Sequence, residues 1–438
     1  MSDRREFLQA AGTAAVGAGV LSGFAGSAGA YAGGDDTIRI GVVGCGGRGS
    51  GAAVDALGVE GSVKLVAMGD IFGDKLDSSL SRIKKAYADK PGRVDVPKEN
   101  KFIGFDAIDK VLAAGIDVII LATPPGFRPQ HFARAVEAGV HVFMEKPVAT
   151  DAPGIRTVLA AAASAKEKGL KVGVGLQRRH ASNYLETAEL IANGDIGDVM
   201  ASRVYWNSSG VWGNATRGTR ENTSTELEYQ LRNWYYYSWI CGDQICEQHI
   251  HNLDIGNWFH GGYPVKARGM GGREVRTGKE FGNIFDHFAV QYEFADGSYM
   301  FSECRHIPKC WNRVGESIQG TKGRVDMGAQ DARIYFTGGA KKRIKSKKNP
   351  YQQEHDDLFA AIRSNLDYNE AEYGAMSTMT SILGRMATYS GQELTMKEAL
   401  ASNKVLVPEL TSFENEPPVV PDGDLVYASP RPGQYKAV

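Results

Sequence analysis

The fold of the first half of this chain is decided by residues 38–49, which read IRIGVVGCGGRG from Ile38 to Gly49. Residues 38–43 are mostly β-branched and predict a short strand, and a helix-like stretch opens at about Ala52. Between them the glycines follow the spacing GxGxxG, which permits a tight turn and a close approach of the backbone to a pyrophosphate. We therefore predict a dinucleotide-binding loop that contains Gly44, Gly46, Gly47, Arg48 and Gly49.

The residues after this loop complete the pattern. A second strand, predicted over residues 63–68, ends at Asp70, where a carboxylate would bind the ribose hydroxyls of NAD. A carboxylate repels a 2′-phosphate, so Asp70 favours NAD. NADP remains the alternative, because Arg48 could reach a phosphate.

Strands and helices are predicted to alternate as far as residue 150. Helices over residues 106–114 and 132–138 alternate with strands over residues 117–122 and 141–144. The run 117–122 is uniformly apolar, as in a parallel strand that is covered on both faces. The pattern predicts a doubly wound, parallel α/β sheet of the Rossmann type.

Two of these predicted strands are followed by residues that the packing of a buried sheet does not require. Strand 117–122 is followed by Thr123-Pro124, and strand 141–144 by Glu145-Lys146. A surface ion pair is the plainer interpretation of Glu145-Lys146, since lysine is costly to bury unless it is paired. Ligands bind at the carboxyl ends of such strands, however. We predict that Lys146 lies beside the nicotinamide, as an acid/base or as a clamp on a developing alkoxide.

Length and composition set the remaining bounds. The 438 residues predict two domains, and 42% hydrophobic with 23% charged residues is normal for a soluble globular protein. The formal net charge of −1 gives no indication of a nucleic-acid partner.

The first 30 residues have the features of a twin-arginine signal peptide. Arg4-Arg5 is followed by Phe7-Leu8, an Ala/Gly/Val stretch and the small-residue site Ala28-Gly29-Ala30. The apolar run is too short and too rich in glycine to span a membrane. We expect the twin-arginine machinery to export the protein to the periplasm, with no membrane span in the mature chain.

The five cysteines are predicted to be mostly free and buried. Cys241 and Cys246 have no zinc-ligand spacing, while a Cys304–Cys310 bridge remains open in an oxidising compartment.

Several further motifs give the chain a family resemblance. They are Ala122-Thr123-Pro124-Pro125, His131, Glu145-Lys146-Pro147, the run GVGLQRR over residues 173–179 and Ile196-Gly197-Asp198-Val199. With the glycine loop and Asp70, they resemble the glucose–fructose oxidoreductase/inositol dehydrogenase/rhizopine-catabolism (Gfo/Idh/MocA) family over most of residues 36–410.

The resemblance implies two domains and an oligomer. The two domains are a Rossmann domain (36–150) and a catalytic α/β domain (151–410). The second domain has a large open antiparallel sheet, which commonly mediates homodimers or homotetramers. Residues 411–438 are predicted to form an extended arm. The expected cofactor contacts beyond the loop are Asp70, Thr123, Pro124, His131, Glu145, Lys146 and Gln177.

The family has a D-x-x-x-H-x-x-D pattern on a helix that lines its cleft. The matching residues are Glu247, His251 and Asp254, with glutamate in place of the first aspartate. Glu247 and His251 are four residues apart, so one helix face would hold both, and the carboxylate would raise the pKa of the imidazole and orient it as a general base. A solvated helix face and a metal site that includes His249 are the open alternatives, although H-E-x-x-H is absent and no metal is expected.

Residues 205–242 form an unusual stretch that is rich in aromatic and polar residues. Aromatic faces stack on sugar rings, so we predict substrate contacts, with core packing as the alternative. The candidate substrate-binding residues are Arg179, Trp234, Tyr236, Trp239 and Asp254. Residues 264–340 predict alternating strands, residues 341–348 a solvated basic loop, and residues 352–364 and 370–390 helices.

The predicted reaction is hydride transfer between a sugar or cyclitol carbon and the nicotinamide. Export implies a tightly held cofactor that is regenerated in place. A redox-neutral conversion by transient oxidation, as in NAD-dependent glycoside hydrolases, is the alternative. A non-catalytic carbohydrate-binding protein is a third hypothesis, against which Lys146 and His251 argue.

Overall fold

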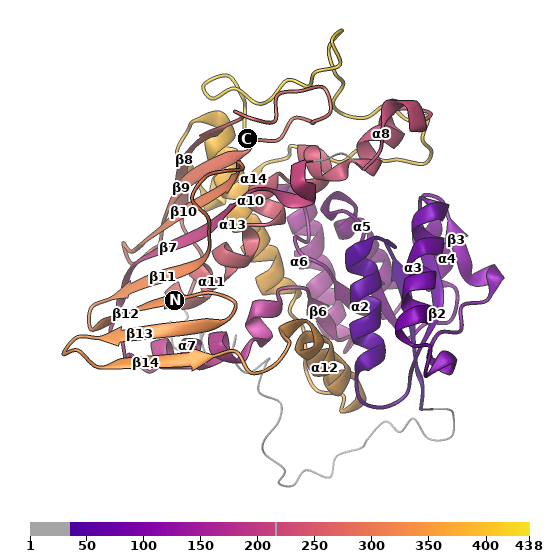
Figure 1. Ribbon diagram of the computed structural model, residues 1–438, viewed down its shortest axis with the longest axis horizontal. Coiled ribbons are helices and arrows are strands. Elements are labelled where there is room, and N and C mark those ends of the chain that lie inside the picture. Colours follow the sequence, from indigo (N-terminus) through magenta and orange to yellow (C-terminus); the bar gives the residue numbers. More distant parts are fainter. Residues whose placement is uncertain (1–35, 215–216) are drawn as a thin grey trace.

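The computed structural model describes residues 36–214 and 217–438 as two β-sheets with helices packed around them (Figure 1). The predicted signal peptide lies outside these residues. Within the described part of the chain no helix is long and apolar enough to cross a membrane.

The first sheet has six strands in the order β3-β2-β1-β4-β5-β6, and every pair is parallel. Its strands are β1 (Ile38–Val43), β2 (Val63–Asp70), β3 (Lys101–Ile103), β4 (Val118–Leu121), β5 (His141–Met144) and β6 (Val172–Val174). The strand order reverses between β1 and β4, and a doubly wound sheet opens a ligand crevice at this switch point. The Rossmann arrangement predicted from the glycine loop is confirmed.

Helices cover both faces of the first sheet. They include α2 (Gly47–Gly58), α3 (Gly73–Ala86), α4 (Ala107–Leu112), α5 (Arg128–Glu137) and α6 (Ala152–Glu167). A later helix, α12 (Pro350–Arg363), packs on α2 and buries Leu358 and Phe359 in the same core as β1 (Figure 1). This return of the chain places the start of α12 beside the glycine loop.

The second sheet has nine strands in the order β14-β13-β12-β11-β7-β10-β9-β8-β15. Its strands are β7 (Val199–Ser208), β8 (Lys266–Gly272), β9 (His287–Glu293), β10 (Tyr299–His306), β11 (Arg313–Gly320), β12 (Gly323–Met327), β13 (Asp331–Phe336), β14 (Lys341–Lys345) and β15 (Leu394–Thr395). Only β7 and β10 pair in parallel within it. The predicted second sheet, mostly antiparallel, is therefore confirmed.

Three helices lie against this sheet: α7 (Ser182–Ala192), α11 (Ile250–His260) and α13 (Ala371–Ser390). Helix α13 packs on both β8 and α6, so it joins the two halves of the molecule (Figure 1). Along β10, buried Met300, Ser302 and Cys304 alternate with exposed Phe301 and Glu303. Period-2 alternation of this kind marks a sheet with one covered and one open face.

Two expectations about local structure are corrected. Residues 341–345 form strand β14 on β13, because the buried Ile344 gives the basic run a sheet-facing side chain. The expected helix face at Glu247 and His251 is broken into α10 (Gln244–Glu247) and α11. The expectation of mostly free, buried cysteines is confirmed, and the open alternative of a Cys304–Cys310 bridge is not formed, with Cys304 buried and Cys310 exposed.

Candidate active site

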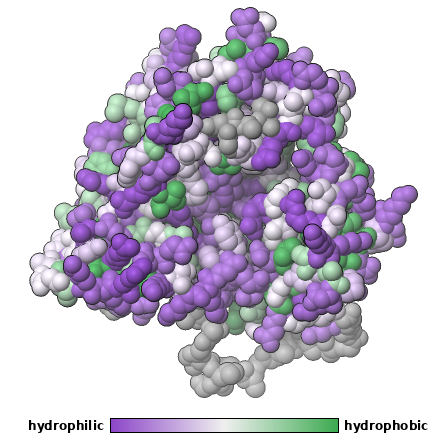
Figure 2. Space-filling model, viewed as in Figure 1, coloured by the Kyte–Doolittle hydropathy of each residue, from purple (hydrophilic) through white to green (hydrophobic). Residues whose placement is uncertain are grey.

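A pocket of about 780 Å³ lies between the carboxyl ends of the first sheet and the second sheet. Figure 2 shows the surface hollowed near its centre, with mostly hydrophilic residues around the hollow. Eight of the predicted site residues line this pocket: Arg48, Thr123, Glu145, Lys146, Gln177, Trp234, Glu247 and His251.

Lys146 and Glu247 meet across the two domains. Lys146 follows β5, and its Nζ donates hydrogen bonds to Oε1 of Glu247 at 2.9 Å and to the Glu247 carbonyl. Burial raises the pKa of Glu247, and the Lys146 ammonium opposes that shift. A charged pair in this setting needs its mutual hydrogen bond to offset desolvation. The pair therefore fixes the ammonium at the mouth of the crevice.

His251 lies on the same pocket as a buried, neutral imidazole. Burial lowers its pKa well below the usual value, and the cations of Lys146 and Arg178 lower it further. Its ring stacks on Trp206, with centroids 5.9 Å apart and planes 26° apart, and its Nδ1 has no hydrogen-bond partner among the described residues. The expected rise of this pKa is wrong, because Glu247 accepts its hydrogen bonds from Lys146 and Gln248.

The break between α10 and α11 explains this difference. The chain turns at Gln248-His249, so Glu247 and His251 do not occupy one regular helix. His249 packs in the core, where its Nε2 lies 2.8 Å from Oγ of Ser302. Within residues 36–214 and 217–438, no group of three His, Cys, Asp or Glu side chains is placed to hold a metal ion.

The glycine loop fits a dinucleotide pyrophosphate. A Cβ at Gly44 would lie 2.4 Å from the Ala122 carbonyl carbon, and one at Gly49 would lie 2.0 Å from the Gly44 carbonyl oxygen. A Cβ at Gly46 or Gly47, in contrast, would meet nothing within 4 Å. Packing thus requires glycine at positions 44 and 49. Gly46 and Gly47, in contrast, are exposed and leave open space at the N-terminus of α2, as an approaching phosphate requires.

Asp70 ties this loop to the end of β2. Its carboxylate accepts hydrogen bonds from the backbone N–H of Cys45 at 2.6 Å and of Phe72 at 2.9 Å. Burial raises its pKa, and these two bonds oppose that rise. The carboxylate lies beside the loop, where ribose hydroxyls would bind.

Arg48 is partly exposed and is held by two carboxylates and an aromatic ring. Its Nε lies 2.7 Å from Oε1 of Glu145, its Nη2 3.6 Å from Oδ2 of Asp55, and its guanidinium 5.0 Å from the ring centre of Tyr351. These contacts occupy the side chain that would bind a 2′-phosphate, so the geometry favours NAD.

The turn after β4 holds the other expected cofactor contacts. Oγ1 of Thr123 lies 3.2 Å from Nδ1 of His131, whose pKa burial lowers to about 3. Pro124 precedes the turn that leads into α5, and neither it nor His131 lines the pocket. Gln177 donates from Nε2 to the hydroxyl of Tyr351 at 3.0 Å.

Other residues that line the pocket include Arg128, Arg178, Tyr184 and Trp206, of which the sequence had not singled out Arg128 and Tyr184. Arg128 is buried and donates to the carbonyls of Thr123 and Pro147, so it fixes the turns after β4 and β5. Arg178 pairs with Glu316 at 2.5 Å. A signal for Arg178 was its place beside Arg179 in the motif GVGLQRR. Trp206 lies within the aromatic stretch 205–242, for which substrate contacts were predicted.

Four predicted substrate residues are core residues instead. Arg179 and Asp254 form a two-pronged ion pair, with hydrogen bonds of 3.0 and 2.7 Å, and are 2% and 1% exposed. Tyr236 is buried among aromatic rings, and Trp239 donates from Nε1 to Gln230 at 2.9 Å. The substrate contact expected of these four is corrected, because none of them lines the pocket.

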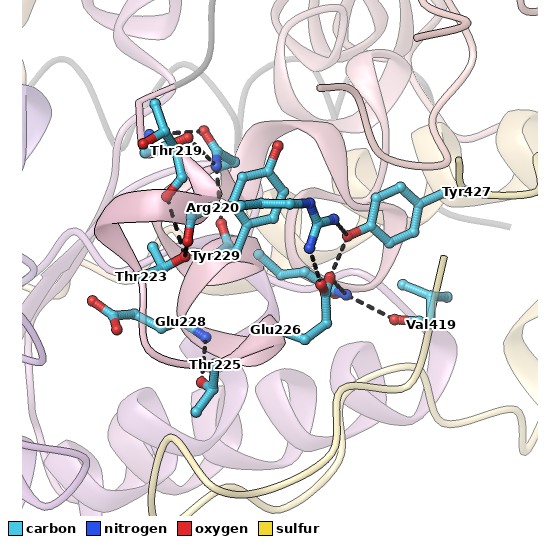
Figure 3. Close-up of polar contacts among 12 residues, drawn as sticks. Thr219, Arg220, Thr223, Thr225, Glu226, Glu228, Tyr229, Val419 and Tyr427 are labelled. Atoms are coloured by element: carbon cyan, nitrogen blue, oxygen red, sulfur yellow. Dashed lines mark hydrogen bonds and ion pairs between the residues drawn. The ribbon is translucent and has the colours of Figure 1, made fainter. Parts of the chain in front are cut away.

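Trp234 alone of the aromatic candidates reaches the pocket, and the C-terminal arm (residues 402–438) stabilises its surroundings. Tyr427 of the arm donates to Glu226 and accepts from Arg220 at 2.8 Å (Figure 3). The arm also supplies the carbonyl of Val419 to Gln230 at 2.7 Å. These contacts pin the aromatic insert (residues 217–242) against the body of the protein.

The insert and the arm both reach the loop that follows Asp70. The ring of Phe413, from the arm, stacks on Phe72 with centroids 5.6 Å apart, and the guanidinium of Arg232, from the insert, lies 4.0 Å from the Phe72 ring centre. The loop beside the expected ribose site is therefore held from two sides.

Sequence comparison finds a family match for the nucleotide-binding domain. Residues 38–176 match the GFO_IDH_MocA family, described as an oxidoreductase family with an NAD-binding Rossmann fold. Over these residues, about a third of the chain, the sequence is similar to the Gfo/Idh/MocA family. The match ends at Leu176, so it covers the glycine loop, Asp70 and Lys146 but not His251.

Relatives of this chain include dehydrogenases of cyclitols. A scyllo-inositol 2-dehydrogenase (NADP(+)) of Bacillus subtilis is 28% identical over 49% of this chain and 52% of its own. Inositol 2-dehydrogenase 3 of Saccharopolyspora erythraea is 31% identical over 60% of this chain and 64% of its own. The matched region thus spans about half the length of the first relative.

Solved structures resemble the whole two-sheet architecture around the Gfo/Idh/MocA domain. Aldose-aldose oxidoreductase from Caulobacter crescentus has a TM-score of 0.64 at 17% identity and covers 82% of this chain and 99% of its own. A levoglucosan dehydrogenase complex with NADH and levoglucosan has a TM-score of 0.65 at 14% identity, with the same coverage. At these identities the likeness supports the fold.

Proposed function

We propose that this protein is an NAD-dependent oxidoreductase that transfers hydride between a sugar or cyclitol carbon and a tightly held nicotinamide. The observation that carries the proposal is the pocket that joins Lys146, Glu247 and His251 beside a glycine loop shaped for a pyrophosphate. The family match and the inositol dehydrogenases among the relatives support it.

The bound nicotinamide supplies the hydride acceptor or donor, and the side chains of this chain manage the proton and the substrate oxygen. The Lys146 ammonium donates a hydrogen bond to the oxygen of the reacting hydroxyl and stabilises negative charge that develops on it. Glu247 orients that ammonium through its 2.9 Å hydrogen bond. His251 is neutral at neutral pH, so its imidazole is free to accept the hydroxyl proton and to return it in the reverse direction.

The rest of the pocket suits a ring with one apolar face and several hydroxyl groups. Tyr184, Trp206 and Trp234 provide aromatic faces along its walls. Gln177, Gln248 and Gln330 provide amide groups for hydroxyls. This combination of flat and polar contacts is suited to a pyranose or a cyclitol.

We further propose that the cofactor stays bound through export by the twin-arginine pathway. The predicted signal peptide motivates this, since the periplasm has no comparable NAD pool to exchange with. The contacts of Phe413 and Arg232 on Phe72 support it, because they hold the loop beside Asp70. Denaturing the purified protein and measuring the released NAD(H) by absorbance and fluorescence tests the proposal; an empty protein would contradict it.

A homodimer or homotetramer is the corresponding proposal for assembly. The face of the second sheet that carries Phe301 is not covered by helices, and such a face is suited to a second copy. Light scattering on the purified protein tests this proposal, and a monomeric mass would contradict it.

The alternative function is a redox-neutral conversion, in which one substrate is transiently oxidised, rearranged or cleaved and then reduced. Both reactions need the same hydride step at Lys146. Supplying pairs of sugars distinguishes them: an oxidoreductase forms an aldonate or ketone together with an alditol, whereas a hydrolase releases an aglycone with no net change in sugar oxidation state.

A further inference from the structure

Cationic side chains dominate the lining of the pocket. Six of its lining residues are cationic (Arg48, Arg128, Lys146, Arg178, Lys347 and Lys348), and two are carboxylates (Glu145 and Glu247). The whole chain, in contrast, has a formal net charge of −1. Charge of one sign that is gathered in a concave site raises the local concentration of oppositely charged ligands.

Three of the cations are neutralised by carboxylates of the protein. Lys146 pairs with Glu247, and Arg48 with Glu145. Arg178 pairs with the fully buried Glu316 behind the wall. Arg128 is committed to two backbone carbonyls and lies among the turns that would hold the nicotinamide. Lys347 and Lys348 are therefore the two cations of the lining that neither pair with a carboxylate nor donate to these backbone carbonyls.

These two lysines line the same pocket as Lys146 but come from the second sheet. Lys146 follows a strand of the first sheet, whereas Lys347 and Lys348 follow β14 of the second sheet, beside Gln330 and Ser346. The Lys347 backbone N–H donates to Oγ of Ser182 at 2.9 Å, and Nζ of Lys348 lies 3.2 Å from the Gln353 amide oxygen. The described lining around these lysines contains donors and cations but no carboxylate. Lys347 and Lys348 are exposed, as expected of a solvated basic segment, and they also line the pocket.

We propose that the substrate is an anionic sugar, which carries a carboxylate or a phosphate ester at the end remote from the carbon that is oxidised. The anionic group lies between Lys347 and Lys348, while the reacting hydroxyl lies at Lys146. A neutral sugar would leave two ammonium groups of the wall without a ligand partner. This inference rests on the proposed oxidoreductase for the place of the reacting carbon, but the charge preference is a property of binding alone.

Ligand binding to the NAD-loaded protein tests the inference through the fluorescence of Trp206 and Trp234. The probes are glucose, glucuronate and glucose 6-phosphate, their galactose counterparts, and myo-inositol. We expect at least one acid or phosphate ester to bind about tenfold or more tightly than its neutral parent, since a charge-assisted hydrogen bond adds to affinity. Comparing glucuronate with glucose 6-phosphate shows whether the anionic group is a carboxylate or a phosphate ester. Added salt weakens only the anionic ligands.

The double variant Lys347→Gln/Lys348→Gln removes the charge and keeps the chain length. It is expected to erase the preference for the anionic ligand while affinity for the neutral sugar and for NAD stays within about twofold. Lys345→Gln is the matched control, because Lys345 belongs to the same basic run but does not line the pocket. It is expected to bind as the unsubstituted protein does.

Three results would overturn the inference: equal affinity for neutral and anionic members of each pair, no binding of any anionic member, or a double variant that loses NAD instead of the anionic sugar. Binding of an anionic sugar that depends on both lysines, without any hydride transfer, supports the inference and contradicts the proposed oxidoreductase. Oxidation of neutral sugars only, without any charge preference in binding, supports the oxidoreductase and overturns the anionic substrate.

Discussion

Nζ of Lys146 lies 2.9 Å from Oε1 of Glu247, and this one hydrogen bond joins the end of a Rossmann strand to the helix break of the second domain. The two residues are 101 positions apart in the chain. Because both also line the pocket, the pair places a fixed positive charge where a sugar hydroxyl would meet the nicotinamide.

Replacing the ammonium is the first test of this arrangement. Lys146→Ala removes the clamp on the substrate oxygen, so we expect turnover to fall about 10²–10⁴-fold. NAD affinity should change little, because the glycine loop and Asp70 are untouched. Stopped-flow absorbance of the nicotinamide measures the first effect, and calorimetry the second. Unchanged turnover would contradict the role of Lys146.

The glycine loop offers a matched pair of substitutions. Gly46→Ala adds a methyl group to open space, so the thermal midpoint should be unchanged while NAD binds about tenfold more weakly, because the methyl group occupies the path of the pyrophosphate. Gly49→Ala should lower the midpoint, because its Cβ would lie 2.0 Å from the Gly44 carbonyl oxygen. Gly92→Ala, remote from the loop and also in open space, is the control. Full NAD affinity in Gly46→Ala would place the cofactor elsewhere.

His251 should remain neutral throughout the physiological range. Burial and the nearby cations lower its pKa well below the ordinary histidine value of about 6.5. Its neutral form therefore stabilises the fold above pH of about 6.5, and that stability is lost as the pH falls and the unfolded chain binds the proton first.

Histidine NMR can check this directly. The ring protons of His251, assigned by comparison with His251→Gln, should not titrate between pH of about 6 and 8. A midpoint at or above about 6.5 would instead support a carboxylate partner for the imidazole, as the sequence pattern alone suggested.

Arg179 and Asp254 should affect stability, not substrate affinity. Removing one partner of a buried pair leaves the other charge unpaired, so Arg179→Met and Asp254→Asn should each cost about 3–5 kcal/mol of unfolding free energy. Urea denaturation measures this. Unchanged stability together with a raised KM for the sugar would instead support the original prediction that these residues contact the substrate.

The local parts of this site could be predicted from sequence, and the contacts across the chain could not. The GxGxxG spacing and Asp70 lie within one strand–loop–helix–strand unit, and the strand-end rule placed Lys146 at the crevice. Glu247 accepts its hydrogen bond from the ammonium of Lys146 and not from the imidazole of His251 because the helix breaks at Gln248. No spacing rule specifies such a break.

Adjacent residues that lie in different environments show the same limit of prediction from sequence. Arg178 lines the pocket while Arg179 is buried with Asp254, and the sequence offers two identical side chains in one motif. In the aromatic insert, Trp234 reaches the pocket while Tyr236 and Trp239 fill the core. The direction of a side chain in such irregular segments depends on tertiary packing, here partly on the C-terminal arm far along the chain.

The most direct test of the central claim is an experimental structure of the protein with bound NAD. We expect the pyrophosphate at Gly46-Gly47 and the nicotinamide in the pocket, with its reactive carbon within about 3–4 Å of a space that both Lys146 and His251 can reach. A nicotinamide bound outside the pocket, or with Lys146 and His251 turned away from it, would contradict the redox function.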